Sequence, residues 1–180
     1  MRLVAVEYVS LDGVFEEPGQ WSHPWFSDEV GQFKWAELQA SDALLLGRKT
    51  YEGFAEAWPK MRAETGEFGE KFNTMPKYVV SSTLDSADWE GSILLKGDPV
   101  EEVRKVREQP GNDLLLNGSA QLFNTLRQAN LIDVYRIMLF PVVLGEGRKL
   151  FADGFGKQPL KPVEQRNYDS GLTIIDYEPA

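Results

Sequence analysis

Residues 44–51 read Leu-Leu-Leu-Gly-Arg-Lys-Thr-Tyr, a short apolar run that passes through a glycine into two cations and a hydroxyl. An apolar run of this length is typical of a strand buried on both faces, and residues 51–58 after it have a helical pattern. A strand that turns directly into a helix presents the free N–H groups of the first helical turn beside these positive side chains. A phosphate would fit there, although an ordinary turn with solvated charges has the same sequence.

A second strand end has the same form. The apolar residues 114–116 lead into Asn117, Gly118 and Ser119, and the apolar spacing of residues 122–129 predicts a helix after them. Because glycine has no side chain, a pyrophosphate could approach the backbone closely at this point. The alternative is a tight turn in which Ser119 caps its helix.

Two further apolar runs end in polar residues. Residues 3–9 stop at a Ser-Leu-Asp-Gly turn signal, and residues 77–80 are followed by Ser81 and Ser82. These two hydroxyls could bond a ribose phosphate, but hydroxyls at strand ends commonly serve only turns. Each of the four strand ends is a weak signal, so their order along the chain carries more information than any one of them.

The pattern of apolar runs predicts an α/β fold, with a mostly parallel twisted sheet, helices on both faces and an antiparallel C-terminal hairpin. In such sheets ligands bind at the carboxyl ends of the strands. Pro141 indicates a bend or an edge in the strand-like stretch 134–144. The predicted strands cover residues 3–9, 43–46, 77–82, 93–95, 114–116 and 134–144, the predicted helices 28–38 with Ser27 as N-cap, 51–58, 100–106 and 122–129, and the hairpin 163–168 with 172–177.

Composition narrows the class of protein. A chain of 180 residues suits one domain, residues 1–180, and the first apolar run reaches an acidic residue too soon for a signal peptide. The cytoplasm is the expected compartment. With no cysteine and one histidine, we expect no metal site. A net charge of −9 disfavours nucleic acid and anionic membranes as partners, so an anionic ligand would need a local positive site.

Taken in order, these motifs resemble the dihydrofolate reductase superfamily, and most closely its branch related to the C-terminal reductase domain of the bifunctional riboflavin biosynthesis deaminase/reductase. The resemblance covers nearly the whole chain. The blocks that carry it are Val9-Ser10-Leu11-Asp12-Gly13-Val14, Leu46-Gly47-Arg48-Lys49-Thr50-Tyr51-Glu52, Val79-Val80-Ser81-Ser82, Leu115-Leu116-Asn117-Gly118-Ser119, Leu131-Ile132-Asp133-Val134-Tyr135-Arg136 and residues 141–151, Pro-Val-Val-Leu-Gly-Glu-Gly-Arg-Lys-Leu-Phe.

The resemblance implies a hydride-transferring oxidoreductase similar to 5-amino-6-(5-phosphoribosylamino)uracil reductase or dihydrofolate reductase, with NADPH as its cofactor. Arg48 would then lie close to the adenosine 2′-phosphate, Ser81 and Ser82 would bond the same phosphate, and Lys96 would lie beside the adenine. The residues implied at the cofactor phosphates are Gly47, Arg48, Lys49 and Thr50.

The resemblance also implies a pyrophosphate contact and a flap over the nicotinamide. Asn117 stands where the family usually has the first residue of a Gly-Gly pair. The residues implied at the pyrophosphate are Asn117, Gly118, Ser119 and Ala120, and those beside the nicotinamide are Ser10, Leu11, Gly13 and Val14.

A reductase also needs a proton donor and a substrate pocket. The candidate donors are Asp12, Asp28 and Glu29, but Asp12 could instead serve a turn, and the other two could be favourable charges at a helix start. Four residues before that helix could line a flat pocket for a heterocycle or form a hydrophobic lid over the core. They are Trp21, His23, Trp25 and Phe26.

Three function classes follow from the sequence: an NADPH-dependent reductase of a small heterocycle, a nucleotide-binding module without turnover, and a structural dimerisation unit. The third is suggested by the apolar strand 137–140. Because the strand-rich segment 131–151 comes late in the chain, we expect it at an exposed antiparallel edge and predict a homodimer built around it.

Overall fold

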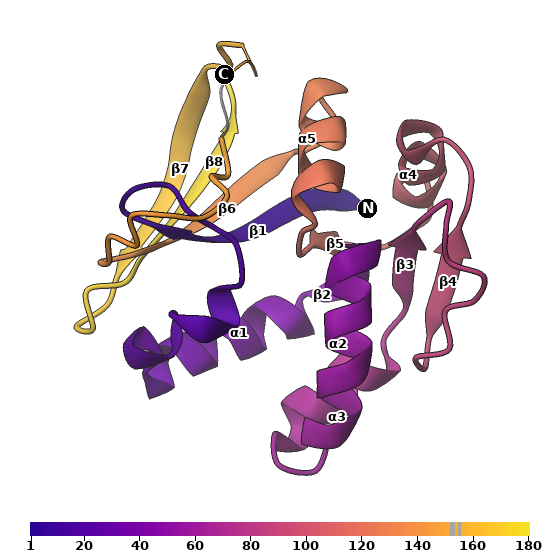
Figure 1. Ribbon diagram of the computed structural model, residues 1–180, viewed down its shortest axis with the longest axis horizontal. Coiled ribbons are helices and arrows are strands. Elements are labelled where there is room, and N and C mark those ends of the chain that lie inside the picture. The colour runs from indigo at the N-terminus through magenta and orange to yellow at the C-terminus, as the bar shows by residue number, and fades with distance from the viewer. Residues whose placement is uncertain (152–153, 155) are drawn as a thin grey trace.

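The computed structural model describes residues 1–151, 154 and 156–180, and its strands form one eight-stranded sheet (Figure 1). The strand order is β4-β3-β2-β5-β1-β6-β8-β7. All pairs from β4 to β6 are parallel, whereas β8 is antiparallel to both β6 and β7. The strands are β1 Arg2–Ser10, β2 Ser41–Gly47, β3 Lys77–Val80, β4 Ser92–Leu95, β5 Asp113–Leu116, β6 Val134–Phe140, β7 Leu160–Asn167 and β8 Thr173–Pro179.

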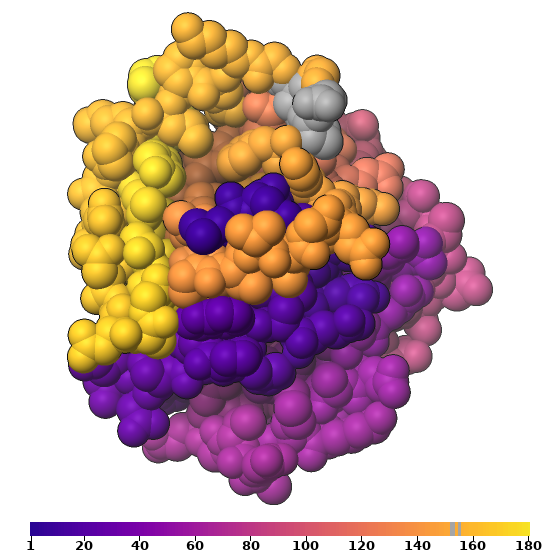
Figure 2. Space-filling model, turned by 60° about the vertical axis from the view of Figure 1, so that its left-hand side comes forward, coloured from indigo at the N-terminus to yellow at the C-terminus, as the bar shows by residue number. Residues whose placement is uncertain are grey.

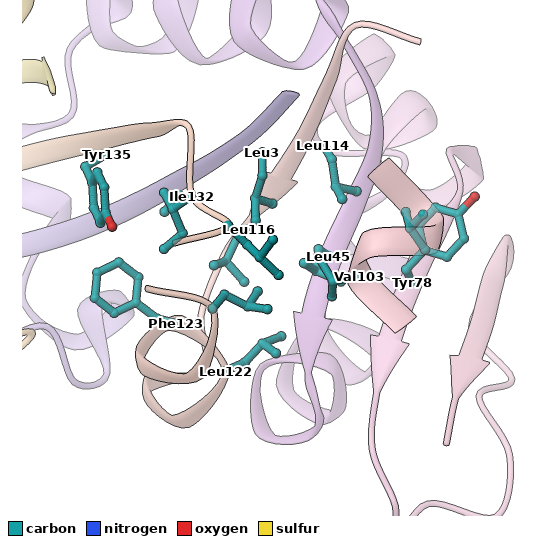
Figure 3. Packing of buried hydrophobic residues seen from close by; sticks show 14 of the residues in the cluster. Leu3, Leu45, Tyr78, Val103, Leu114, Leu116, Leu122, Phe123, Ile132 and Tyr135 are labelled. Atoms are coloured by element: carbon teal, nitrogen blue, oxygen red, sulfur yellow. The ribbon is translucent and has the colours of Figure 1, made fainter. Parts of the chain in front are cut away.

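Helices cover both faces of the sheet. The helices are α1 Asp28–Gln39, α2 Arg48–Met61, α3 Gly66–Thr74, α4 Pro99–Arg107 and α5 Ala120–Gln128, with short 3-10 turns at Pro18–Gln20 and His23–Trp25. One apolar cluster joins the strands to α1, α2 and α3, and a second joins them to α4 and α5. Figure 3 shows Leu122 and Phe123 of α5 in this second cluster, where the Phe123 ring lies edge-on to Tyr135 at 6.0 Å. Because the central strands are covered on both sides, their sequences are apolar without alternation.

The predicted fold class is confirmed, including the C-terminal hairpin. The predicted position of the segment 131–151 at an exposed edge is wrong, because β6 lies inside the sheet between β1 and β8. Seven residues of β6 pair with β1, and the strand ends at Phe140 because Pro141 has no N–H to continue the ladder. The long apolar run therefore marks an internal strand. Within the described residues, no helix has the length and apolar character that a membrane span requires.

The strand β7 forms one edge of the sheet. Its pairing with β8 shifts register between Pro162 and Glu164, and most of its side chains are exposed. The other edge is β4, a strand of four residues.

Candidate functional site

The strand ends selected from the sequence lie along one edge of the sheet. Because β4, β3, β2, β5 and β1 are parallel neighbours, their carboxyl ends follow one another in that order. The residues brought into this row are Lys96, Ser81 with Ser82, Gly47 to Thr50, Asn117 to Ala120, and Ser10 to Val14. Five neighbouring strands span roughly 19 Å at the usual strand spacing, so the row suits an extended ligand.

The ends of β2 and β5 are in direct contact. The backbone N–H of Gly47 donates to the carbonyl of Gly118 at 3.2 Å, and the N–H of Asn117 donates to Leu45 at 3.3 Å. A Cβ atom added at Gly47 would lie 2.3 Å from Ser119 Oγ and 3.1 Å from the Ser119 backbone N, so a larger residue would require Ser119 to move. The contact brings the first turns of α2 and α5 side by side.

The N-termini of these two helices have no side-chain caps. Neither Gly47 before α2 nor Ser119 before α5 caps its helix, whereas Ser27 caps α1 and Asp98 caps α4. The interpretation of Ser119 as a cap is therefore wrong. The free N–H groups of the two first helical turns thus lie beside each other, and their partial positive charge favours binding of an anion.

Two cations stand at the start of α2. Arg48 and Lys49 are exposed, and the ion pair of Arg48 with Glu52 is long at 3.4 Å, with both side chains about half exposed. Lys49 forms no ion pair within the part of the chain that the structure describes. Both side chains are therefore available to a negatively charged ligand.

Gly118 has a positive φ of +67°, which side-chain-bearing residues rarely adopt. The peptide bond between Gly118 and Ser119 is cis. A Cβ added at Gly118 would lie 2.9 Å from Thr50 Oγ1, so this residue also borders the first turn of α2. The glycine thus serves a turn as well as the close approach of the two helix ends.

The loop after β1 is attached to the segment that follows β6. Asp12 accepts hydrogen bonds from Ser10 Oγ at 2.7 Å and from the backbone N–H groups of Leu144 at 3.1 Å and Gly145 at 2.8 Å. Figure 2 shows these N-terminal residues, in indigo, beside the orange segment around residue 145. The hydrogen bonds lower the pKa of Asp12 to about 2, with Ser10 as the largest cause, so its carboxylate is suited to holding the loop and poorly suited to donating a proton.

The remaining predicted residues differ in their surroundings. Ser81 is buried, and its Oγ accepts from the backbone N–H groups of Thr83 at 3.2 Å and Leu84 at 3.1 Å, which is a turn contact. Ser82 and Lys96 are exposed at their strand ends. The turn interpretation of Ser81 has direct support, while Ser82 and Lys96 remain free to meet a ligand.

The two candidate acids lie in the first turn of α1. Asp28 and Glu29 are exposed in the first turn of α1, after the N-cap Ser27, so their position fits favourable charge at a helix start.

The aromatic residues before α1 pack on Phe140 of β6. The ring centroids of Trp21 and Trp25 lie 5.3 Å and 6.2 Å from that of Phe140, and Phe26 lies 6.3 Å away. Trp21 also donates its indole N–H to the carbonyl of Glu16. This packing favours the lid interpretation, and His23 lies exposed in the same segment.

Sequence reasoning missed Glu7, a buried acid on β1 with 4% of its surface exposed. Burial raises its pKa to about 8, and a hydrogen bond from the Gly118 backbone opposes that shift. A single acid inside the apolar run of residues 3–9 is the signal that could have revealed it.

The comparisons with known proteins agree with this architecture. The sequence model of the RibD C-terminal domain family matches residues 2–174. The uncharacterized protein YyaP of Bacillus subtilis strain 168 is 34% identical over 142 residues, which are 78% of this chain and 75% of that protein.

Two solved structures show the same fold. A Shewanella sp. PV-4 protein named for riboflavin biosynthesis superposes with a TM-score of 0.80 and 22% identity, over 100% of this chain and 99% of that one. Dihydrofolate reductase from Enterococcus faecalis, complexed with NADP(H) and RAB-propyl, gives a TM-score of 0.63 and 17% identity, over 99% and 96%.

Proposed function

This chain belongs to the RibD C-terminal domain family, a branch of the dihydrofolate reductase-like fold, and from that membership we propose that it is an NADPH-dependent reductase. Its substrate would be a small heterocycle such as a pyrimidine or a pterin, related to that of 5-amino-6-(5-phosphoribosylamino)uracil reductase. The membership supports a reductase-like module, and the cofactor and substrate are the parts that we propose.

One observation carries the proposal: the uncapped N-termini of α2 and α5 meet at Gly47 and Ser119, at the carboxyl edge of a parallel sheet. Two helix ends with free N–H groups provide a site for a pyrophosphate. Arg48 and Lys49 supply the local positive charge that an anion needs on a protein of net charge −9.

The row of strand ends also fits the rest of a dinucleotide. Arg48 and Ser82 would hold the 2′-phosphate, Lys96 would lie beside the adenine, and Thr50 would bond the phosphates through its hydroxyl. The loop Ser10–Val14 would lie beside the nicotinamide. When bound, the reduced nicotinamide supplies the hydride.

The chain itself must position the substrate and exclude water. We assign water exclusion to the loop after β1, which Asp12 attaches to residues 144 and 145, and to the rings that cover Phe140. The low pKa of Asp12 leaves proton delivery to Asp28, to Glu29 or to an ordered water.

The proposal includes a homodimer. Ile137 and Leu139 of β6, with Ile175 of β8 beside them, are only partly buried. They give one face of the sheet an apolar surface that a second copy could cover. We therefore propose that the two copies of the chain meet on this face of the sheet and not at its edge.

Titration with NADPH, followed by its fluorescence, tests cofactor binding, and NADPH consumption with a panel of pyrimidines and pterins tests turnover. We expect saturable binding and oxidation with at least one substrate. Binding without oxidation would favour the nucleotide-binding module, and absence of binding would overturn the proposal.

A further inference from the structure

Glu7 lies in the candidate site although it is not at a strand end. The β1–β5 pairing reaches Ala5 opposite Leu116, so two residues further along each chain bring Glu7 level with Gly118. Its neighbours in alternation, Ala5 and Val9, belong to the cluster on the α4 and α5 side of the sheet. The carboxyl of Glu7 therefore lies beneath the turn that joins β5 to α5.

The carboxyl of Glu7 is buried and incompletely bonded. Its Oε1 is inaccessible to solvent and has no hydrogen-bond partner in the described structure, and the strand register places the carboxyl level with Gly118. Buried polar atoms usually have partners, so an orphaned oxygen next to a ligand loop calls for an explanation. A ligand atom that reaches the Gly118 turn would supply the missing partner.

Burial favours the uncharged form of this acid. The causes of its raised pKa are burial and, in the opposite direction, the Gly118 N–H, with no charged side chain among them. Titratable groups on this side of the sheet include Tyr78 on β3, Tyr135 on β6, Tyr177 on β8 and Arg127 on α5. Glu7 thus has no paired cation that would stabilise its ionised form.

A negatively charged ligand at Gly118 would also favour the uncharged form of Glu7. An ionised Glu7 would place a negative charge beside the phosphates, in a low-dielectric site where like charges repel strongly. A neutral carboxylic acid can instead donate its O–H to a ligand oxygen.

We propose that Glu7 is a binding residue of the cofactor site that must carry a proton when the dinucleotide binds, and that it donates a hydrogen bond to an oxygen of the ligand held at Gly118. This inference rests on the proposed function, because it requires the anion site between α2 and α5. It assigns to this chain a coupling between cofactor affinity and pH near neutrality, which Asp12, with its pKa of about 2, does not provide.

The test is NADPH affinity from pH 7 to pH 9. With a pKa of about 8 for free Glu7, the Kd should rise about tenfold over this range, and binding at pH 8 should take up about half a proton. Titration calorimetry in two buffers of different ionisation enthalpy measures this uptake directly. The measurement needs no variant, so it remains decisive if a substitution prevents folding.

Glu7→Gln removes the ionisable group and keeps a hydrogen-bond donor, so the Kd of the variant should be the same at pH 7 and pH 9. Glu108→Gln, at an exposed position after α4, is the matched control and should keep the natural pH dependence. A pH dependence that survives in Glu7→Gln would overturn the inference and point to another group, such as Lys77, whose pKa burial lowers to about 8.

The possible failures are distinguishable. If NADPH binds with the same Kd at pH 7 and pH 9 and without proton uptake, the role of Glu7 is overturned while the proposed function stands. If NADPH does not bind at any pH, both are overturned.

Discussion

A β-carbon placed on Gly47 would lie 2.3 Å from the Oγ of Ser119, nearer than any real contact allows. The backbone of Gly47 has φ −78° and ψ 161°, which any residue can adopt. The requirement for glycine is therefore entirely one of space, at the point where α2 and α5 begin.

Gly47→Ala should separate these two helix ends. Overpacking of this kind costs about 1–3 kcal/mol of unfolding free energy, and it should weaken NADPH binding as well. Adding Ser119→Gly removes the two nearest atoms, Oγ and Cβ, and leaves the backbone N of residue 119 at 3.1 Å, so the double variant should regain part of the stability lost in Gly47→Ala. Urea unfolding of the four proteins in a double-mutant cycle measures the coupling, and strictly additive effects would contradict the contact.

Arg48→Ala should reduce the preference for NADPH over NADH. A charge-assisted hydrogen bond is worth about 1.5–3 kcal/mol, and we expect the lower end, about tenfold in Kd, because this side chain is half exposed. The NADH affinity should fall less, because NADH loses only a charge near its pyrophosphate and has no 2′-phosphate. Fluorescence titration with both cofactors measures the effect, and equal Kd values for the two cofactors in the unmodified protein would remove its basis.

Asp12→Asn should loosen the loop after β1. The folded pKa of about 2 is below the unfolded value of about 3.9, so the contact is complete above the unfolded pKa and is lost as the pH falls through 2. Hydrogen exchange at the amides of Leu144 and Gly145 should be faster in the variant at pH 7. Unchanged exchange would mean that Asp12 does not hold this segment.

Glu7→Gln should change how stability depends on pH without any ligand. The unfolded chain releases the Glu7 proton near pH 4.3, whereas the folded chain keeps it to about pH 8. Unfolding therefore releases a proton between these values, and this residue makes the protein less stable as pH rises, by roughly 3–5 kcal/mol at most. Denaturant unfolding at pH 5 and pH 8 should show a smaller loss in the variant, and equal losses would mean that Glu7 is not neutral.

Light scattering at micromolar concentration tests the homodimer. We expect twice the mass of one chain, and Ile137→Lys should shift the protein toward the monomer by placing a charge on the partly buried face of β6. Gln32→Lys, at an exposed position of α1 on the other face of the sheet, serves as the control for added charge. A mass near that of one chain, unchanged on dilution, would contradict the dimer.

Much of this arrangement could be predicted from the sequence because buried parallel strands leave a simple pattern. Short apolar runs followed by Gly, Ser or Asn predicted the row of strand ends, and residues 163–168 with 172–177 were recognised as the strands of the hairpin. Helix α3 was missed, since Gly66 and Gly69 weaken its helical signal, and packing of Phe72 in the core stabilises it instead.

The site was harder to predict because burial and pairing are tertiary properties. The apolar run of β6 could not reveal that β1 and β8 would flank it. Glu7 appeared only as a break in an apolar run, and its importance depends on Gly118, 111 positions away in the chain and next to it in space. Conversely, Asp12 has the position of a proton donor in the sequence and the hydrogen bonds of a loop anchor in the structure.

The outermost strand, β7, has a consequence for how the protein stays dispersed in a crowded cell. An open strand edge is a template for aggregation, since its unpaired N–H and C=O groups can add strands from other molecules. Pro162, the register shift after it, and the charged side chains of Lys161, Glu164 and Arg166 interrupt that template. Copies of this chain are thereby discouraged from joining edge to edge into fibrils, which leaves the faces of the sheet for controlled association.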